Sequence, residues 1–463
     1  MFDTLTRMGS SAAGDYEIER SARLPGPDWQ HFKRTFGTNS SANTRTLSFW
    51  IKRAKLGSYQ TLFGTTNSGN MEGRLQFTNT DTLQYTDRDA ANGTTDVQII
   101  TTRAFRDTST WYHIVFIQDN SNGTQGDRHR LFVNGVEETS FSSEDQAASD
   151  YVASFFRSSA ENFIGSNNGS YCFQGYMTEV HFIDGAVKTA DKFGETNSLT
   201  GQWVPKKYTE GSYGTNGFYL NFSDNSDVTA TTLGKDSSGQ SNNWTPQNLS
   251  VSGAATDSFE DTPTNNFPIF NWNQTRSVTD DRLYEAGLRM DWQASHDNAS
   301  TVVTHGMSSG KWYFEVTNLT DSSGQGNMNL GFFPDDYANG KRCQNTNAWP
   351  GLEAGSGIGF TGDDTYYLNG SNQGTYGGTW AENDIIGIAV DADLKNALAS
   401  TLIGRLKDNS VKRNTSLNLD AKVLLNGGIK LTRSPGAALY GFNEFKRGTF
   451  SGKLKPGGRW RKD

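Results

Sequence analysis

The sequence has few cysteines and no long hydrophobic run, and each shortage excludes a class of protein. Its 463 residues include only 2 cysteines, Cys172 and Cys343, which lie far apart in the chain. We therefore expect neither a disulfide framework nor a cysteine metal site. No run approaches the roughly 18 apolar residues of a membrane-spanning helix, and the N-terminal MFDTLTRMGSS lacks the apolar core of a signal peptide. The sequence thus predicts no membrane insertion and synthesis in a cytoplasm.

Helical periodicity is also scarce, whereas turn formers and aromatic residues are common. Hydrophobic residues make up 34% of the chain and aromatic residues 12%, and 50 residues are glycine. This composition favours short strands joined by turns, and therefore an all-β protein. Because 463 residues exceed what one hydrophobic core usually organises, two or three domains are expected.

Negative charge dominates most of the chain but not its end. The formal net charge is −8 and the pI about 5.4, which argues against nucleic acid as a partner. Residues 394–463 hold 15 Lys/Arg and 4 Asp/Glu, a net of +11, whereas the first 393 residues hold 27 and 46, a net of −19. This basic segment is either a solvated tail or a surface that docks on an acidic partner subunit. Binding to nucleic acid is the weakest alternative, since aromatic residues rarely alternate with basic ones there.

The stretch from Trp111 to Val136 organises the first half of the chain. Residues 111–117 are largely apolar on both faces of the expected strand, as in a strand packed inside a two-layer structure. Residues 119–127 are rich in turn formers. A second short strand, RLFV, then leads into Asn134-Gly135, the strongest two-residue hairpin signal. One long hairpin is expected.

Several strand motifs around this hairpin occur in a recognisable order. They are TLSFWIK (residues 46–52), WYHIVF with LFVNG (111–116 and 131–135), and IG followed by FQGYMTEV (164–165 and 173–180). This order resembles the laminin-G, or concanavalin A-like, jelly-roll family over residues 17–206. The resemblance implies a sandwich of two antiparallel sheets. Because the family includes lectins, glycosidases, adhesion modules and spacers, function must be argued from residues.

The strand EVHFID lacks the carboxylate pair of a glycosidase. A retaining enzyme needs two carboxylates about 5 Å apart. Glu179 and His181 share one face of the expected strand, Ile183 takes the next position on that face, and Asp184 points to the other. We therefore expect that the protein is not an enzyme.

The loop DNSNG, which follows the first strand of the hairpin, offers hard oxygen ligands. Asp119, Asn120 and Asn122 are the candidates, and members of the resembling family often hold calcium in such loops. The same residue types form ordinary hairpin turns. Calcium is one alternative, and a turn without any cofactor is the other.

Residues 207–268 are interpreted as a polar linker that wraps one of its neighbours, because FYLNF is their one clear strand. The arm MFDTLTRMGSSAAGDYEIERS, the segments WVPKKY and YGTNGFYL, and the turn DSSGQSNNWTP resemble a family of bacteriophage virion proteins. Members of that family carry a laminin-G-like domain near the N-terminus. The resemblance covers the chain from residue 1 to about 265.

A second module follows. GKWYFEV (310–316), LGF (330–332), YYLNG (366–370) and NDIIGIAVD (383–391) resemble, in this order, the SPRY domain, a β-sandwich used for recognition. That family continues with further strands. In LKNALASTLIGRL (394–406), however, leucines recur at helical spacing and predict a short helix.

Two loop-like stretches of this module have the chemistry of a sugar site. Trp349 in NAWPG and Tyr366, Tyr367 and Asn369 in YYLN combine aromatic rings, on which sugar rings stack, with amides that bind hydroxyls. The alternative is that these aromatic residues belong to the core or to a sheet edge.

The sequence therefore predicts two antiparallel β-sandwiches in an all-β chain. The expected parts are an N-terminal docking arm (1–16), a laminin-G-like sandwich (17–206), a polar linker (207–268), a SPRY-like sandwich (269–393) and a basic C-terminal segment (394–463). The phage resemblance implies a structural virion component, a tail fibre or tail-associated protein that attaches to host-surface glycan. A capsid decoration or architectural subunit without sugar binding is the alternative. Other virion proteins and copies of itself are the expected partners, and the virion is the expected location, after synthesis in the bacterial host.

Overall fold

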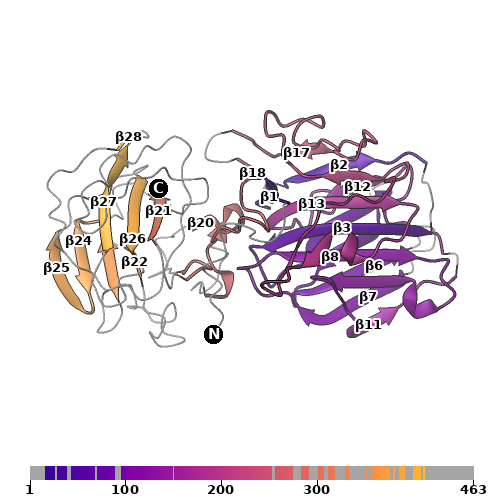
Figure 1. Cartoon of the computed structure of the whole chain (residues 1–463), viewed down its shortest axis with the longest axis horizontal. Coiled ribbons are helices and arrows are strands. Elements are labelled where there is room, and N and C mark those ends of the chain that lie inside the picture. The colour runs from indigo at the N-terminus through magenta and orange to yellow at the C-terminus, as the bar shows by residue number, and fades with distance from the viewer. Residues whose placement is uncertain are drawn as a thin grey trace. The chain divides into compact units, whose positions relative to one another are not determined.

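The computed structural model describes residues 16–26, 29–38, 43–67, 70–88, 95–149, 151–252, 256–274, 283–290, 301–306, 311–318, 329–332, 351, 357–375, 379–380, 385–391, 400–407 and 410–411. These residues fall into two units (Figure 1). The first comprises the described residues up to 266 together with 283–290, and the second comprises 267–274 and the described residues from 301 onward. The predicted N-terminal arm apart from Tyr16, most of the basic segment, and Cys343 lie outside the described residues.

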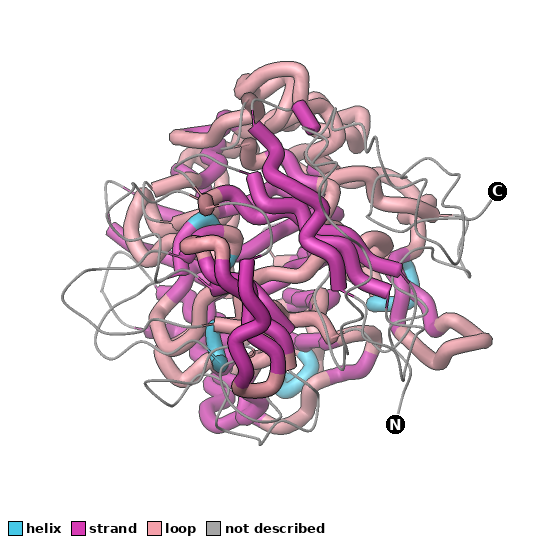
Figure 2. The backbone as a smooth tube through the Cα atoms, turned by 90° about the vertical axis from the view of Figure 1, so that its left-hand side faces the viewer, coloured by secondary structure: helices cyan, strands magenta, loops and turns pink. Residues whose placement is uncertain are grey.

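The described chain is all-β, as the composition predicted. Strands and loops make up nearly all of it, and helix occurs only as short 3₁₀ turns (Figure 2). These turns are Gln125–Asp127, Ala190–Lys192, Trp272–Gln274 and Glu285–Gly287. No helix within the described ranges is long and apolar enough to span a membrane.

The first unit is built on two eight-stranded antiparallel sheets. Sheet A has the order β10-β9-β8-β3-β13-β1-β18, and β16 also pairs with β13. Its strands are β1 (Ser21–Leu24), β3 (Thr44–Arg53), β8 (Tyr112–Asp119), β9 (His129–Val133), β10 (Val136–Glu137), β13 (Gly175–Asp184), β16 (Phe218–Leu220) and β18 (Ser258–Phe259). Sheet B has the order β11-β7-β6-β5-β4-β12-β2-β17. Its strands are β2 (His31–Thr35), β4 (Gln60–Asn67), β5 (Asn70–Phe77), β6 (Thr82–Arg88), β7 (Thr95–Ala104), β11 (Phe141–Asp145), β12 (Glu161–Ile164) and β17 (Thr245–Gln247).

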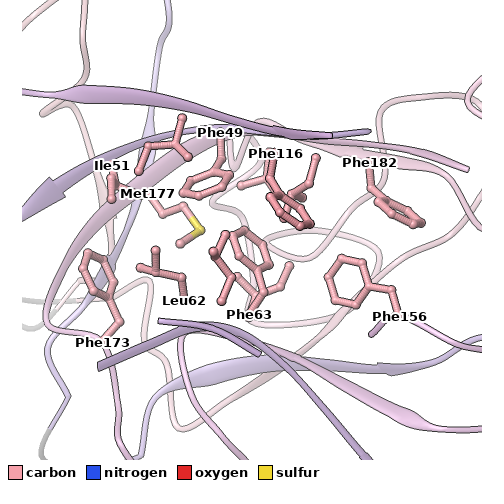
Figure 3. Close-up of a cluster of buried hydrophobic side chains, with 14 of the residues drawn as sticks. Phe49, Ile51, Leu62, Phe63, Phe116, Phe156, Phe173, Met177 and Phe182 are labelled. Carbon is pink, nitrogen blue, oxygen red and sulfur yellow. The ribbon is translucent and has the colours of Figure 1, made fainter. Parts of the chain in front are cut away.

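The hydrophobic core lies between these two sheets. Alternate residues of each strand point into it, because successive side chains of a strand lie on opposite faces. Figure 3 shows Phe49, Phe116 and Met177 of sheet A meeting Leu62 and Phe63 of sheet B. The structure is therefore a sandwich whose inner faces are apolar, as the period-two pattern predicted.

The predicted hairpin is present. β8 pairs with β9 in antiparallel register, with Ile114 opposite Val133 and Ile117 opposite Arg130. Asn134 and Gly135 follow β9 with φ of 49° and 78°, and they turn the chain into β10. The left-handed conformation at both positions explains why an Asn-Gly pair occurs there.

The polar linker predicted at residues 207–268 is wrong as far as residue 266. In this stretch β16 pairs with β13, β17 pairs with β2, and β18 pairs with β1. Trp244 is fully buried and packs edge-on against Phe36 and Phe218. Strands of two or three residues carry too little periodicity to be recognised, yet they are stable here because they extend sheets that already exist.

A further layer covers the outer face of sheet A. Val115 and Ile117 of β8 and Ile183 of β13 pack against Phe193 and Tyr208 in one apolar cluster. The same stretch contains the small sheet of β14 (Gly194–Thr196) and β15 (Trp203–Pro205). Sheet A is consequently buried on both faces, and β13 is buried along its whole length.

The second unit contains two four-stranded antiparallel sheets. One has the order β21 (Lys311–Thr317), β26 (Ile385–Asp391), β27 (Ser400–Lys407) and β28 (Ser410–Val411). The other has the order β22 (Asn329–Phe332), β23 (Ile358–Thr361), β24 (Thr365–Leu368) and β25 (Ser371–Thr375). The hairpin β19 (Leu283–Tyr284) and β20 (Arg289–Met290) belongs to the first unit.

The helix predicted at residues 394–406 is wrong from residue 400 onward, because these residues belong to β27 and pair with β26, while residues 394–399 lie outside the described residues. The leucines at 398, 402 and 406 recur every four residues. A spacing of four fits one face of a helix and also one face of a strand, so the leucine pattern alone could not distinguish a helix from a strand. The SPRY resemblance of this unit stays a prediction.

Candidate functional site

The sugar site predicted in the second unit is described at three of its four residues and stays a prediction. Trp349 lies outside the described residues. Tyr366 and Tyr367, both partly buried, lie on β24, and the ring of Tyr366 stacks on Phe360 with centroids 6.1 Å apart. Asn369 has φ 47°, and its Oδ1 accepts the backbone N–H of Gly357 at 3.0 Å. The asparagine side chain therefore holds a turn.

Two of the three predicted calcium ligands accept hydrogen bonds within the loop, whereas the buried Oδ1 of Asn120 has no partner among the described residues. The Asp119 carboxylate accepts the Ser121 hydroxyl at 2.7 Å, and Oδ1 of Asn122 accepts the backbone N–H of Thr124 at 2.9 Å. Asn120 is buried, and its amide donates to the carbonyl of Tyr151. Across the described ranges, no three acidic, histidine or cysteine side chains form a group that could hold a metal. Calcium stays a prediction.

Glu179 of β13 is buried behind aromatic hydroxyls. A bulge gives it a φ of 52°, and its carboxylate accepts the hydroxyls of Tyr16 and Tyr219 at 2.5 and 2.6 Å. Nε2 of His181 lies 3.6 Å from the same carboxylate. Asp184 instead accepts the backbone N–H of Asn216 at 3.0 Å. Glu179 thus acts as an anchor for Tyr16, the last residue of the predicted N-terminal arm.

The candidate site is a cluster that the sequence analysis missed. Among the residues whose burial is described, three aromatic side chains are exposed, namely Trp29 at 62%, Tyr59 at 43% and Tyr171 at 56%. All three gather at one rim of the sandwich. Tyr59 meets Tyr171 edge-on at 6.4 Å between centroids, and Trp29 lies against the turn that precedes Tyr171. We name these three residues the aromatic rim.

A tight loop between β12 and β13 positions the rim. Asn167 and Ser170 face each other across a two-residue turn, in which Asn168 and Gly169 have φ of 45° and 78°. A Cβ placed on Gly169 would meet the Trp29 ring at 3.7 Å, so the indole packs directly on the turn. The loop is fixed to β4, because the N–H of Thr61 donates to the carbonyl of Tyr171 at 2.7 Å.

Two of the rim residues adopt a backbone conformation that is unfavourable for them. Trp29 has φ 60° and Tyr171 has φ 50°. The left-handed region costs a residue with a side chain roughly 1–2 kcal/mol, and bulky residues are rarely found there. Neither aromatic ring is buried, so burial of the ring does not offset this cost. Such strain at an exposed aromatic residue is typical of a functional position.

One sequence signal could have located the rim. Trp29 follows Gly-Pro-Asp, and Tyr171 follows Asn-Asn-Gly-Ser, so each aromatic residue comes directly after turn formers. An aromatic residue at the end of a turn does not belong to the alternating pattern of a strand. The distance in sequence between residues 29, 59 and 171 hid their proximity.

Comparisons with known proteins agree with the fold of the first unit. A laminin-G-type family model, described as the concanavalin A-like lectin/glucanases superfamily, matches residues 20–191. No curated protein matches the sequence. The structure is similar to a heptameric SAP-like pentraxin from Limulus polyphemus, with 14% identity, 41% of this chain and 94% of that chain covered, and a TM-score of 0.29.

Two further similar structures are parts of bacterial enzymes. One is domain 4 of an extracellular arabinanase from Geobacillus stearothermophilus, in complex with arabinotriose, with 18% identity, 38% and 76% of the two chains covered, and a TM-score of 0.25. The other is the CBM40 of the Ruminococcus gnavus IT-sialidase bound to alpha2,3 sialyllactose, with 16% identity, 36% and 91% covered, and a TM-score of 0.24. Residues 20–191 of the present chain therefore have a concanavalin A-like fold.

Proposed function

We propose that the first unit is a non-catalytic glycan-binding module whose contact surface is the aromatic rim. The observation that carries this proposal is the gathering of the three exposed aromatic side chains at one place on a lectin-type fold. Sugar rings stack their apolar faces on such side chains, while nearby amides and hydroxyls bind the sugar hydroxyls. Asn168 and Ser170 supply these polar groups in the same loop.

We further propose that the whole chain is a virion component, a tail fibre or tail-associated protein that presents this module to host-surface glycan. The support is the resemblance of residues 1–265 to bacteriophage virion proteins. Cryo-electron microscopy of purified particles tests this role by locating the chain. Density for it at the tail would support the proposal, whereas density on the capsid would favour the decoration alternative.

Glycan binding is tested on the isolated protein. The intact chain and the variants Trp29→Ala and Tyr171→Ala are applied to a panel of bacterial surface polysaccharides, and Leu199→Ala, a change at another exposed apolar residue, is the control. We expect each aromatic variant to weaken binding roughly tenfold, as for loss of an aromatic contact. Unchanged binding by both variants would exclude the rim. Release of reducing ends by the intact protein would contradict the non-catalytic role.

A further inference from the structure

Arg74 of β5 is a cation that forms no ion pair with a described side chain. Its neighbours Gly73 and Leu75 face the core, so the Arg74 side chain lies on the outer face of sheet B. The side chain is partly buried, and its Nε is shielded from solvent without a hydrogen-bond partner. Within the described ranges no carboxylate pairs with it. Burial lowers the pKa of Arg74, and the phenols of Tyr171 and Tyr59 and the guanidinium of Arg88 are close enough to contribute to this shift.

Shielded cations of this unit bind either carboxylates or backbone carbonyls, and Arg45 and Arg128 donate to the carbonyls of Phe155 and Ala147. Arg23 pairs with Asp257 at 3.0 Å, and Lys52 pairs with Asp261 at 2.8 Å. Removing a cation from water is costly unless an anion or several acceptors compensate. Among the described residues Arg74 has neither kind of partner, and it lies near two residues of the aromatic rim.

The register of sheet B places a second cation in the same row. Lys33 lies opposite Phe163, Phe163 opposite Gly64, and Gly64 opposite Arg74 on consecutive strands. Because strands are about 4.8 Å apart, Lys33 and Arg74 lie about 14 Å from each other along this row. A Cβ on Gly64 would meet the carbonyl oxygen of Ser166 at 3.2 Å, so the loop that carries Tyr171 crosses the row between the two cations.

We propose that the aromatic rim binds an acidic glycan, with a sugar carboxylate held by the Arg74 guanidinium while sugar rings stack on Tyr59 and Tyr171. This inference rests on the proposed glycan binding and adds the class of sugar. A guanidinium presents parallel N–H donors that match the two oxygens of a carboxylate. Lys33, on the other side of the loop, takes a second negative charge of the same polymer.

The test compares polymers that differ only in charge. Polygalacturonate and its methyl ester share one backbone, and dextran sulfate and dextran share another. Affinity of the whole chain for each polymer is measured by titration calorimetry at low and high salt. We expect binding to polygalacturonate at least roughly tenfold tighter than to its ester, because the ester removes the charge-assisted hydrogen bonds. This preference should decrease as salt screens the charges.

Variants assign the preference to Arg74. Arg74→Gln removes the charge and should abolish both the preference and its salt dependence, while Arg74→Lys keeps the charge without the planar fork and should fall between. Arg103→Gln removes an equal charge from an exposed position paired with Glu138, and should behave as the intact protein. Thermal unfolding of each variant confirms that it folds.

The possible outcomes distinguish failure of the acidic-sugar inference from failure of the proposed glycan binding. Equal binding of polygalacturonate and its ester, lost in Trp29→Ala, would overturn the acidic-sugar inference and leave glycan binding intact. Tight binding of dextran sulfate but not polygalacturonate would overturn the carboxylate assignment. Arg74-dependent binding of single-stranded DNA without any polysaccharide binding would overturn the inference and the proposed function together.

Discussion

Trp29 and Tyr171 have an unfavourable backbone conformation although their rings are exposed to solvent. Their positive φ values are tolerated easily by glycine and asparagine but not by bulky residues. If the rings were structural, replacing them would cost stability. If they are functional, replacing them with a residue suited to the left-handed region should cost binding alone.

Tyr171→Asn therefore separates the two roles. Asparagine tolerates the left-handed conformation, so we expect the free energy of unfolding to change by less than about 1 kcal/mol, measured by urea denaturation. Glycan affinity should fall roughly tenfold. A loss of stability of several kcal/mol would instead show that the ring of Tyr171 supports the fold.

His113 of β8 shows how burial fixes a protonation state. Its Nδ1 accepts the indole N–H of Trp203 at 2.9 Å, so its Nε2 carries the proton and donates to the Ser48 hydroxyl at 2.8 Å. Burial, with a smaller contribution from His181, lowers the pKa of His113 to about 3. Protonation would place a second N–H against the indole N–H, which the geometry does not accommodate.

The lowered pKa has a defined effect on stability. Between pH 6.5 and about 3 the unfolded state binds a proton at His113 that the folded state does not, so this stabilising contribution is present above pH 6.5 and is lost as pH falls. Burial raises the pKa of Asp87 to about 7, which acts in the opposite direction. We therefore expect the ring resonances of His113, followed by NMR, to show no titration from pH 8 to 5. A midpoint near 6.5 would contradict the burial argument.

At the scale of elements, the sequence predicted the long interior strands and missed the short ones. β3, β8 and β13 have eight to ten residues each, enough for an apolar pattern to be recognised. β16 and β17 have three residues each, and their apolar partner Trp244 stands alone in a polar stretch. Their stability comes from the sheets they join, which sequence periodicity does not describe.

The segment from 207 to 266 is therefore expected to be part of the folding unit. A fragment of residues 10–291 should unfold in one cooperative transition. A fragment of residues 10–206 should aggregate, because removal of the later residues exposes the side chains that pack against Phe218 and Trp244 and leaves sheet edges open. Residues 283–290 are included because Glu285 pairs with Arg23 at 2.9 Å. Size-exclusion chromatography and urea denaturation compare the two fragments. An equal denaturation midpoint for both would show that the segment is only a linker.

At the scale of the whole molecule, composition predicted the all-β class but not the place of the candidate site. Residues 29, 59 and 171 lie in three separate loops, and only the pairing of β2, β4 and β12 brings these loops together. The net charge of −8 adds a further constraint on the ligand. An acidic protein repels an acidic polymer, so recognition of one would depend on the few cations of a single face.

The layer over sheet A makes the two faces of the first unit different. Leu199 lies on the turn between β14 and β15, in the layer that packs on sheet A, whereas the aromatic rim is carried by loops attached to sheet B. A copy tethered to a solid support through position 199 would still present its rim to the surrounding liquid. A copy tethered through position 171 would hide it. In an ordered array of these domains, attachment through the face that carries Leu199 would leave the aromatic rim accessible to ligand.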